Sequence, residues 1–228
     1  MITVSGLTRR YGRRTALDDV SFAVGKGTLC ALCGGNGAGK TTLLRVVAGY
    51  LDADAGRVAL ADGARLGYLP EGAPLPPELT VAEYVRHRAA LAGGGDVVTA
   101  LRDVDLTDRA GDAIGKLSKG LRQRTALAGV LVAAPRVLAL DEPASGLDEV
   151  QRTELRQRLR ALVSGDRTIL WSTHELSDVE AEADQIVVLA GGRVVAEGDV
   201  AAIKAAAGMA DAPLREAVAV LAARSERS

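Results

Sequence analysis

No hydrophobic run in this chain of 228 residues is long enough to cross a bilayer, because a spanning helix needs roughly 18 to 20 apolar residues in succession. The polar opening MITVSGLTRR also differs from the pattern of a secretory signal peptide. The sequence therefore predicts a cytoplasmic protein, and we expect any membrane role to come through a partner.

The chain has no excess of positive charge either. Lys and Arg number 28 against 29 Asp and Glu, which gives a formal net charge of -1. Proteins that hold nucleic acid through many phosphate contacts need clustered positive charge, so we expect no nucleic acid partner. No internal repeat or long low-complexity tract is visible. Because the length suits one sizeable core, we expect a single domain over residues 1–228.

Cysteine and histidine are scarce, with two of each. Cys30 and Cys33 form a C-x-x-C, but zinc takes about four ligands and both histidines lie far away in the sequence. If TLCALC is a strand, an offset of three sends the two side chains to opposite faces, which opposes a disulfide. We expect two buried strand thiols.

Apolar strands and amphipathic helices alternate along most of the chain. VLAL and QIVVL are continuous apolar runs that suit a sheet covered on both faces. Residues 79–132 are helical in character and are interrupted by GGGD at 93–96. Leu155, Leu159 and Leu162 follow the i, i+4, i+7 spacing of one buried helix stripe. These patterns predict an α/β unit that carries a helical lobe.

A phosphate-binding motif lies between a predicted strand and a predicted helix. GGNGAGKTT at 34–42 fits G-x-x-x-x-G-K-[ST] through Gly34, Gly39, Lys40 and Thr41. Glycines let backbone N–H groups surround phosphates, and the positive helix end favours anions. We expect Lys40 to reach the β- and γ-phosphates and the Thr41 hydroxyl to ligate Mg²⁺. The other loop residues expected to bind nucleotide are Gly35, Asn36, Gly37, Ala38 and Thr42.

Two other predicted strands end in chemically active side chains. RVLALDEP ends in Asp141, which we expect to hold magnesium, and Glu142, which we expect to polarise the attacking water. The alternative is that both acids only cap the next helix. TILWSTHEL places His174 at a strand end, where open α/β sheets contact their ligands. We predict Glu142, His174 and Lys40 to be the catalytic residues.

LSKGLRQR at 117–124 stands where an apolar helix begins. From residue type alone, Ser118 is an ordinary helix cap. Its place among the other motifs changes that interpretation. GGNGAGKTT, LSKGLRQR, VLALDEPASGLD and STH occur in the order and approximate spacing of Walker A, signature, Walker B with D-loop, and H-loop. The chain thus resembles, over nearly its whole length, the ATP-binding subunit of an ATP-binding cassette (ABC) transporter.

The resemblance implies a fold and an activity. The implied fold is α/β, a P-loop NTPase of the ABC type with a mainly parallel core sheet, an N-terminal antiparallel β subdomain and an inserted helical subdomain at about 72–133. A short helical tail would follow at about 199–228. The implied reaction is hydrolysis of ATP, with Mg²⁺, to ADP and phosphate. The implied location is the inner face of the cell membrane, through a separate permease.

The resemblance also implies that two such subunits, a homodimer, pair head to tail with each ATP between the P-loop of one and the signature of the other. Ser118 and Gly120 would then face the partner's ATP, and Asp148 would lie at the dimer interface. Tyr11, in RRYGRR, would stack on adenine. The alternative for RRYGRR is a nucleic-acid patch, but the stretch is too short to supply many phosphate contacts.

Several residues depart from the family pattern. Glu71, in GYLPEG, stands where glutamine is common, and its carboxylate could offer oxygen to magnesium while repelling the γ-phosphate. Lys119 and Leu121 replace a glycine and a glutamine of the signature, and Gly35 and Glu149 stand where proline is frequent. GYLPE together with LSKGLRQR resembles ATPases that drive export of drugs, lipids, polymers or other solutes.

Other classes of P-loop protein fit less well. A soluble ABC-type ATPase acting on ribosomes or DNA usually has two cassettes or a long coiled-coil insertion, whereas this chain has one copy of each motif. A GTPase would need an N/T-K-x-D motif, which is absent. A P-loop kinase would not need LSKG or SGLD.

Overall fold

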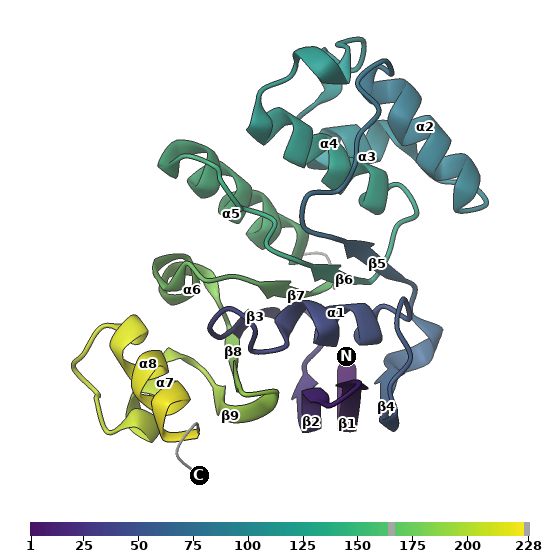
Figure 1. Ribbon diagram of the computed structural model, residues 1–228. Coiled ribbons are helices and arrows are strands. Elements are labelled where there is room, and N and C mark those ends of the chain that lie inside the picture. Colours follow the sequence, from purple (N-terminus) through teal and green to yellow (C-terminus); the bar gives the residue numbers. More distant parts are fainter. Residues whose placement is uncertain (164–166, 226–228) are drawn as a thin grey trace.

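The computed structural model describes residues 1–163 and 167–225. Within them the strands form a three-stranded sheet in the order β2-β1-β4 and a six-stranded sheet in the order β5-β6-β7-β3-β8-β9 (Figure 1). The small sheet is antiparallel, and in the large sheet all pairs are parallel except β8 with β9. This confirms the predicted fold class. The strands are β1 Ile2–Tyr11, β2 Arg14–Val24, β3 Leu29–Cys33, β4 Ala55–Leu60, β5 Leu66–Leu69, β6 Val137–Leu140, β7 Thr168–Ser172, β8 Gln185–Ala190 and β9 Arg193–Gly198.

The helices divide into a lobe, helices that cover the core sheet, and a tail. In Figure 1, α2, α3 and α4 lie together beyond the β5 edge of the core sheet. The predicted break at GGGD falls between α2 and α3. The tail consists of α7 and α8, and the last predicted residues, 226–228, lie outside the described ranges. The helices are α1 Lys40–Val47, α2 Val81–Leu91, α3 Val97–Asp103, α4 Lys119–Leu131, α5 Glu149–Val163, α6 Leu176–Glu182, α7 Val200–Ala207 and α8 Leu214–Ser225, with short 3-10 turns at Ala61–Gly63, Thr107–Arg109 and Ile114–Lys116.

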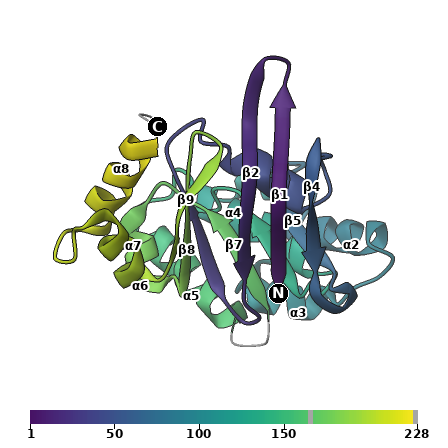
Figure 2. The same ribbon diagram turned by 90° about the horizontal axis from the view of Figure 1, so that it is seen from below.

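The core sheet is buried on both faces. On one face Cys30 and Leu32 of β3 pack in a cluster with α1 and the small sheet, which lies in front of the core sheet in Figure 2. On the other face Cys33 packs in a cluster with α4 and with the leucine stripe of α5. Both thiols are free and buried. The prediction of two strand thiols on opposite faces is confirmed, because strand side chains alternate between faces.

The parallel register brings three strand ends together. Leu140 of β6 pairs with Trp171 of β7, and Leu32 of β3 pairs with Ser172 of β7. The residues that follow β3, β6 and β7 therefore leave the sheet side by side at one edge, where ligands of open α/β sheets bind. That edge carries the P-loop, Asp141 with Glu142, and His174.

Among the helices described here, none combines the length and the apolar character that crossing a membrane requires.

Candidate active site

The P-loop follows a path that only glycine allows at two positions. A Cβ on Gly34, whose φ is +153°, would lie 2.2 Å from the Leu189 carbonyl oxygen. A Cβ on Gly39, whose φ is +108°, would lie 2.5 Å from the Ala16 carbonyl oxygen. The loop is thus confined between β8 and β2 and then enters α1 at Lys40. The first N–H groups of that helix have no partner within the helix, which makes its start suitable for an anion.

A cavity of about 250 Å³ opens beside this loop. It brings together most of the residues that the sequence predicts for nucleotide binding, along with two that it does not. The lining residues are Tyr11, Arg14, Ala16, Asn36, Gly37, Ala38, Gly39, Lys40, Thr41, Thr42, Glu71 and Glu142.

Lys40 lies inside the loop and is 8% exposed. Its Nζ donates to the carbonyl oxygens of Gly34, at 2.8 Å, and Gly35, at 3.3 Å. These two predicted residues contribute through their carbonyls and do not line the cavity. Because neutral carbonyls leave the ammonium charge uncompensated, the loop presents net positive charge to an incoming phosphate.

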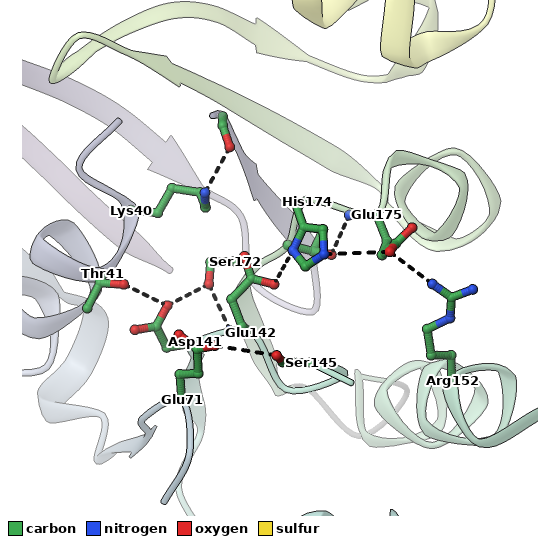
Figure 3. A network of polar contacts seen from close by, with 12 residues as sticks. Lys40, Thr41, Glu71, Asp141, Glu142, Ser145, Arg152, Ser172, His174 and Glu175 are labelled. Atoms are coloured by element: carbon green, nitrogen blue, oxygen red, sulfur yellow. Dashed lines mark hydrogen bonds and ion pairs between the residues drawn. The ribbon is translucent and has the colours of Figure 1, made fainter. Parts of the chain in front are cut away.

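A buried carboxylate joins the loop to two strands. Asp141 is 1% exposed, and its Oδ1 accepts from Thr41 Oγ1 at 3.2 Å and from Ser172 Oγ at 2.7 Å (Figure 3). Within the described part of the chain, Asp141 forms no ion pair. A carboxylate and a hydroxyl at this distance are oxygen ligands of the kind that Mg²⁺ takes. Sequence reasoning missed Ser172, whose signal is a polar residue at the end of an apolar strand.

Glu142 lies at the cavity wall in an unusual backbone conformation. Its φ of +46° is in the left-handed region, which costs a non-glycine residue about 1–3 kcal/mol. Its N–H donates to Ser172 Oγ at 2.9 Å, and its Oε2 lies 2.9 Å from His174 Nδ1. The His174 side chain is 57% exposed, while that of Glu142 is 14% exposed. The strained backbone thus directs the carboxylate toward both the cavity and the imidazole.

Glu71 brings a second carboxylate to the same cavity. Its Oε1 accepts a long hydrogen bond, 3.4 Å, from Ser145 Oγ in the segment after Glu142. The loop that carries Glu71 is therefore linked to the segment that follows β6. An acid here adds negative charge to a cavity that already holds Glu142, which partly offsets the charge of Lys40.

Tyr11 and Arg14 stand opposite each other at the end of the β1–β2 hairpin. Tyr11 is 46% exposed and lines the cavity, with the Arg9 guanidinium 5.2 Å from its ring centroid. Arg14 Nη2 donates to the Gly37 carbonyl at 3.3 Å. Arg14 and Ala16 belong to no sequence motif that predicts nucleotide binding, although both follow Tyr11 closely in the hairpin.

The signature residues lie apart from this cavity. Ser118 caps α4, since its Oγ accepts from Leu121 N at 3.3 Å, and the predicted helix cap is confirmed. Ser118 and Gly120 line a separate depression of about 30 Å³. Asp148 accepts from Gln151 N at 2.9 Å at the start of α5. One chain therefore does not bring Ser118, Gly120 or Asp148 to the P-loop.

The Cys33 thiol, which directly precedes the P-loop, is not a reactive group. Burial raises the pKa of Cys33 to about 12, an effect that Lys40 reduces and Glu142 adds to. Since the thiolate is the reactive form, Cys33 is unreactive at neutral pH.

Comparison with known proteins agrees with this geometry. The sequence pattern of the ABC transporter family matches residues 17–145. The daunorubicin resistance ATP-binding protein DrrA3 of Streptomyces coeruleorubidus is 38% identical in an alignment that covers 95% of this chain and 74% of that protein. The Nod factor export ATP-binding protein I of Ralstonia nicotianae is 34% identical in an alignment that covers 87% of this chain and 67% of that protein.

A solved structure of the ATP-binding subunit of an ABC transporter superposes with a TM-score of 0.85 and 30% identity, covering 97% of this chain and 99% of the other. Fold, strand-end geometry and sequence all agree. The chain belongs to the ABC transporter family as an ATP-binding subunit, an ATPase that works with transmembrane components.

Proposed function

We propose that this subunit powers export, as a homodimer docked on a separate permease at the cytoplasmic face of the membrane. Support for export comes from the GYLPE and LSKGLRQR patterns and from a relative that is named for export. The observation that carries the proposed chemistry is the contact between Glu142 and His174 at the wall of a cavity that also holds Lys40 and Thr41.

The proposed reaction transfers the γ-phosphoryl group of ATP to water. Backbone N–H groups of the P-loop and Lys40 bind the β- and γ-phosphates, and Tyr11 stacks on adenine. Glu142 orients the water and takes its proton as the water oxygen bonds to the γ-phosphorus. The bond from that phosphorus to the bridging oxygen breaks, and ADP leaves. His174 holds the Glu142 carboxylate, beside the place of the γ-phosphate.

Mg²⁺ is part of the proposal. Thr41 and Asp141 would hold the ion, and Glu71, which lines the cavity with Thr41, would contribute an oxygen. The described residues contain no group of three or more acids, histidines or cysteines that could hold a metal by themselves. That arrangement suits Mg²⁺, which keeps water ligands and relies on substrate phosphates. When bound, the ion neutralises charge on the β- and γ-phosphates.

The proposed site is completed by a second copy of the chain. Ser118 and Gly120 stand at the start of α4, whose dipole favours an anion. Since they lie apart from the P-loop cavity of their own chain, we assign them to the γ-phosphate bound by the partner. Asp148 would lie at the interface. In this arrangement residues 1–228 act as one domain with its helical lobe at 72–133.

The test of hydrolysis is Glu142→Gln. We expect ATP binding to remain, turnover to fall by about 10²- to 10⁴-fold, and an ATP-bound dimer to accumulate in size-exclusion chromatography. Glu78→Gln, an exposed acid outside the cavity, is the matched control. Undiminished hydrolysis by Glu142→Gln would remove Glu142 from its role.

The test of export is a membrane experiment. The tagged subunit should co-purify with a polytopic membrane protein. That pair, reconstituted in vesicles with the subunit outside, should move solute inward across the vesicle wall when ATP is added. Movement in the opposite direction would identify an importer and contradict the proposal.

A further inference from the structure

A line of ionisable side chains continues from Glu142 away from the cavity (Figure 3). His174 has Glu142 on its Nδ1 side, at 2.9 Å, and Glu175 on its Nε2 side, where Glu175 Oε1 lies 3.6 Å away. The same Glu175 oxygen lies 3.0 Å from Arg152 Nη1 on α5. Glu142, His174, Glu175 and Arg152 thus connect the ends of β6 and β7 with the start of α5.

Arg152 and Glu175, the two members of this line farthest from the cavity, are both held in place. Glu149, the first residue of α5, accepts a hydrogen bond from Arg152 Nη2, and this bond raises the pKa of the guanidinium. The Arg152 side chain is only 20% exposed. The Glu175 N–H donates to Thr173 Oγ1 at 3.0 Å. Glu149 thus supplies a carboxylate that fixes the Arg152 guanidinium.

The His174 imidazole therefore lies between two carboxylates, each of which can accept a hydrogen bond from a ring N–H. A neutral imidazole has a single N–H, on Nδ1 or on Nε2. With the proton on Nδ1 the ring donates to Glu142, and with the proton on Nε2 it faces Glu175. Arg152 compensates the charge of Glu175, which weakens the attraction of Glu175 for the ring proton and favours the bond to Glu142.

We propose that Arg152 and Glu175 are positioning residues for His174, and that Arg152 keeps the imidazole proton on Nδ1, toward Glu142, by pairing with Glu175. In this way a residue near the start of α5, close to Asp148, influences which ring nitrogen of His174 carries the proton. This inference rests on the proposed roles of Glu142 and His174 in hydrolysis.

A double-variant experiment tests the proposal through kinetics. Arg152→Gln leaves Glu175 charged and uncompensated, so we expect kcat to fall about tenfold while KM for ATP is unchanged. Arg152→Lys should retain most of the activity because it keeps the charge. In Arg152→Gln with Glu175→Gln the competing carboxylate is gone, and kcat should recover to within about threefold of the parent.

Arg160→Gln is the matched control. Arg160 lies on the same helix and pairs with Asp184 at 2.6 Å, away from His174. The Arg160→Gln variant should leave kcat unchanged. A double variant as impaired as Arg152→Gln alone, or a loss expressed as raised KM, would overturn the proposal, because a merely structural role for Arg152 predicts additive damage.

The tautomer itself can be measured without hydrolysis. The chain has two histidines, and His87 is exposed on α2, so His87→Gln leaves His174 as the single imidazole. Its ¹⁵N NMR signals in ATP-free protein at alkaline pH should report Nδ1–H in this background, Nε2–H after Arg152→Gln, and Nδ1–H again in the double variant. One tautomer in all three would refute the inference. Hydrolysis by Glu142→Gln would refute the catalytic proposal alone.

Discussion

The P-loop cavity and the signature surface are built in different ways. On the cavity side, side chains bond across long stretches of sequence, as in Thr41 with Asp141 and Ser172 with Asp141, 100 and 31 residues apart. On the signature side, Ser118 and Asp148 are exposed and bond only three residues along the chain, to Leu121 and Gln151.

This difference indicates what each region needs to work. The cavity side is fixed by the register of the core sheet, so it can receive a nucleotide in a single chain. On the signature side, the Ser118 and Asp148 side chains themselves are placed by helix caps, which set the first turn of a helix. In the proposed dimer, the partner chain would present its bound nucleotide to these exposed side chains.

The strongest way to break the cavity side is Lys40→Ala. The variant removes the only side-chain cation that bonds to the carbonyls of Gly34 and Gly35 in the described residues. We expect loss of ATP binding and a fall in hydrolysis of at least about 100-fold. Binding is measured with a fluorescent ATP analogue. Lys204→Ala, on α7 and paired with Glu180, should bind ATP normally. Retained binding in Lys40→Ala would contradict the site.

The matching change on the signature side is Ser118→Arg. Hydrolysis should fall by about 100-fold while each monomer still binds ATP, because the intact cavity is elsewhere. Mixing Ser118→Arg with Lys40→Ala then sharpens the comparison. Half of the dimers would be mixed, and each would contain one intact composite site, so the mixture should regain about a quarter of the parental activity. A mixture with no activity would exclude sharing of sites between chains.

A smaller effect is expected at the edge of the cavity. Tyr11→Ala removes the aromatic ring, which should weaken ATP binding about tenfold, since stacking on a base contributes about 1–3 kcal/mol. Tyr11→Phe keeps the ring and should bind ATP as tightly as the parent. Titration calorimetry measures both. Unchanged affinity in Tyr11→Ala would rule out stacking.

The smallest effect separates capping from dimer contact. Asp148→Ala should lower the free energy of unfolding by about 1 kcal/mol, because it removes the cap of α5. The melting temperature should fall by about 2–4 °C. Asp148→Asn keeps the cap and should restore the melting temperature. If Asp148→Asn also restores full hydrolysis, the proposed interface role of the carboxylate is wrong.

The sequence predicts those parts of the site that are encoded locally. The P-loop between β3 and α1, the Ser118 cap and the opposite faces of Cys30 and Cys33 all follow from residues within a few positions of one another. The α/β class follows from apolar runs and their alternation with helices. This pattern can be recognised without knowing which strands are neighbours.

Contacts between distant segments were not predictable in the same way. Arg14 bonds to Gly37, which lies 23 residues further along the chain. Arg152, near the start of α5, pairs with Glu175, which directly precedes α6. Ser172 bonds to Asp141 because β6 and β7 are neighbours in register. Strand order and register determine these pairs, and one strand's residues carry no signal for the identity of its neighbour.

The glycines of the P-loop also determine where the chain can be labelled. Gly34 and Gly39 cannot be replaced by cysteine without a clash, since a Cβ at either would overlap a carbonyl oxygen. Gly35 is different, because among the described residues no atom beyond its chain neighbours lies within 4 Å of a Cβ there, and its φ is not in the left-handed region. Both native thiols are buried. A thiol-reactive fluorophore added to Gly35→Cys would therefore label a single accessible thiol, within the P-loop but outside the cavity lining, and could time the arrival and departure of each nucleotide.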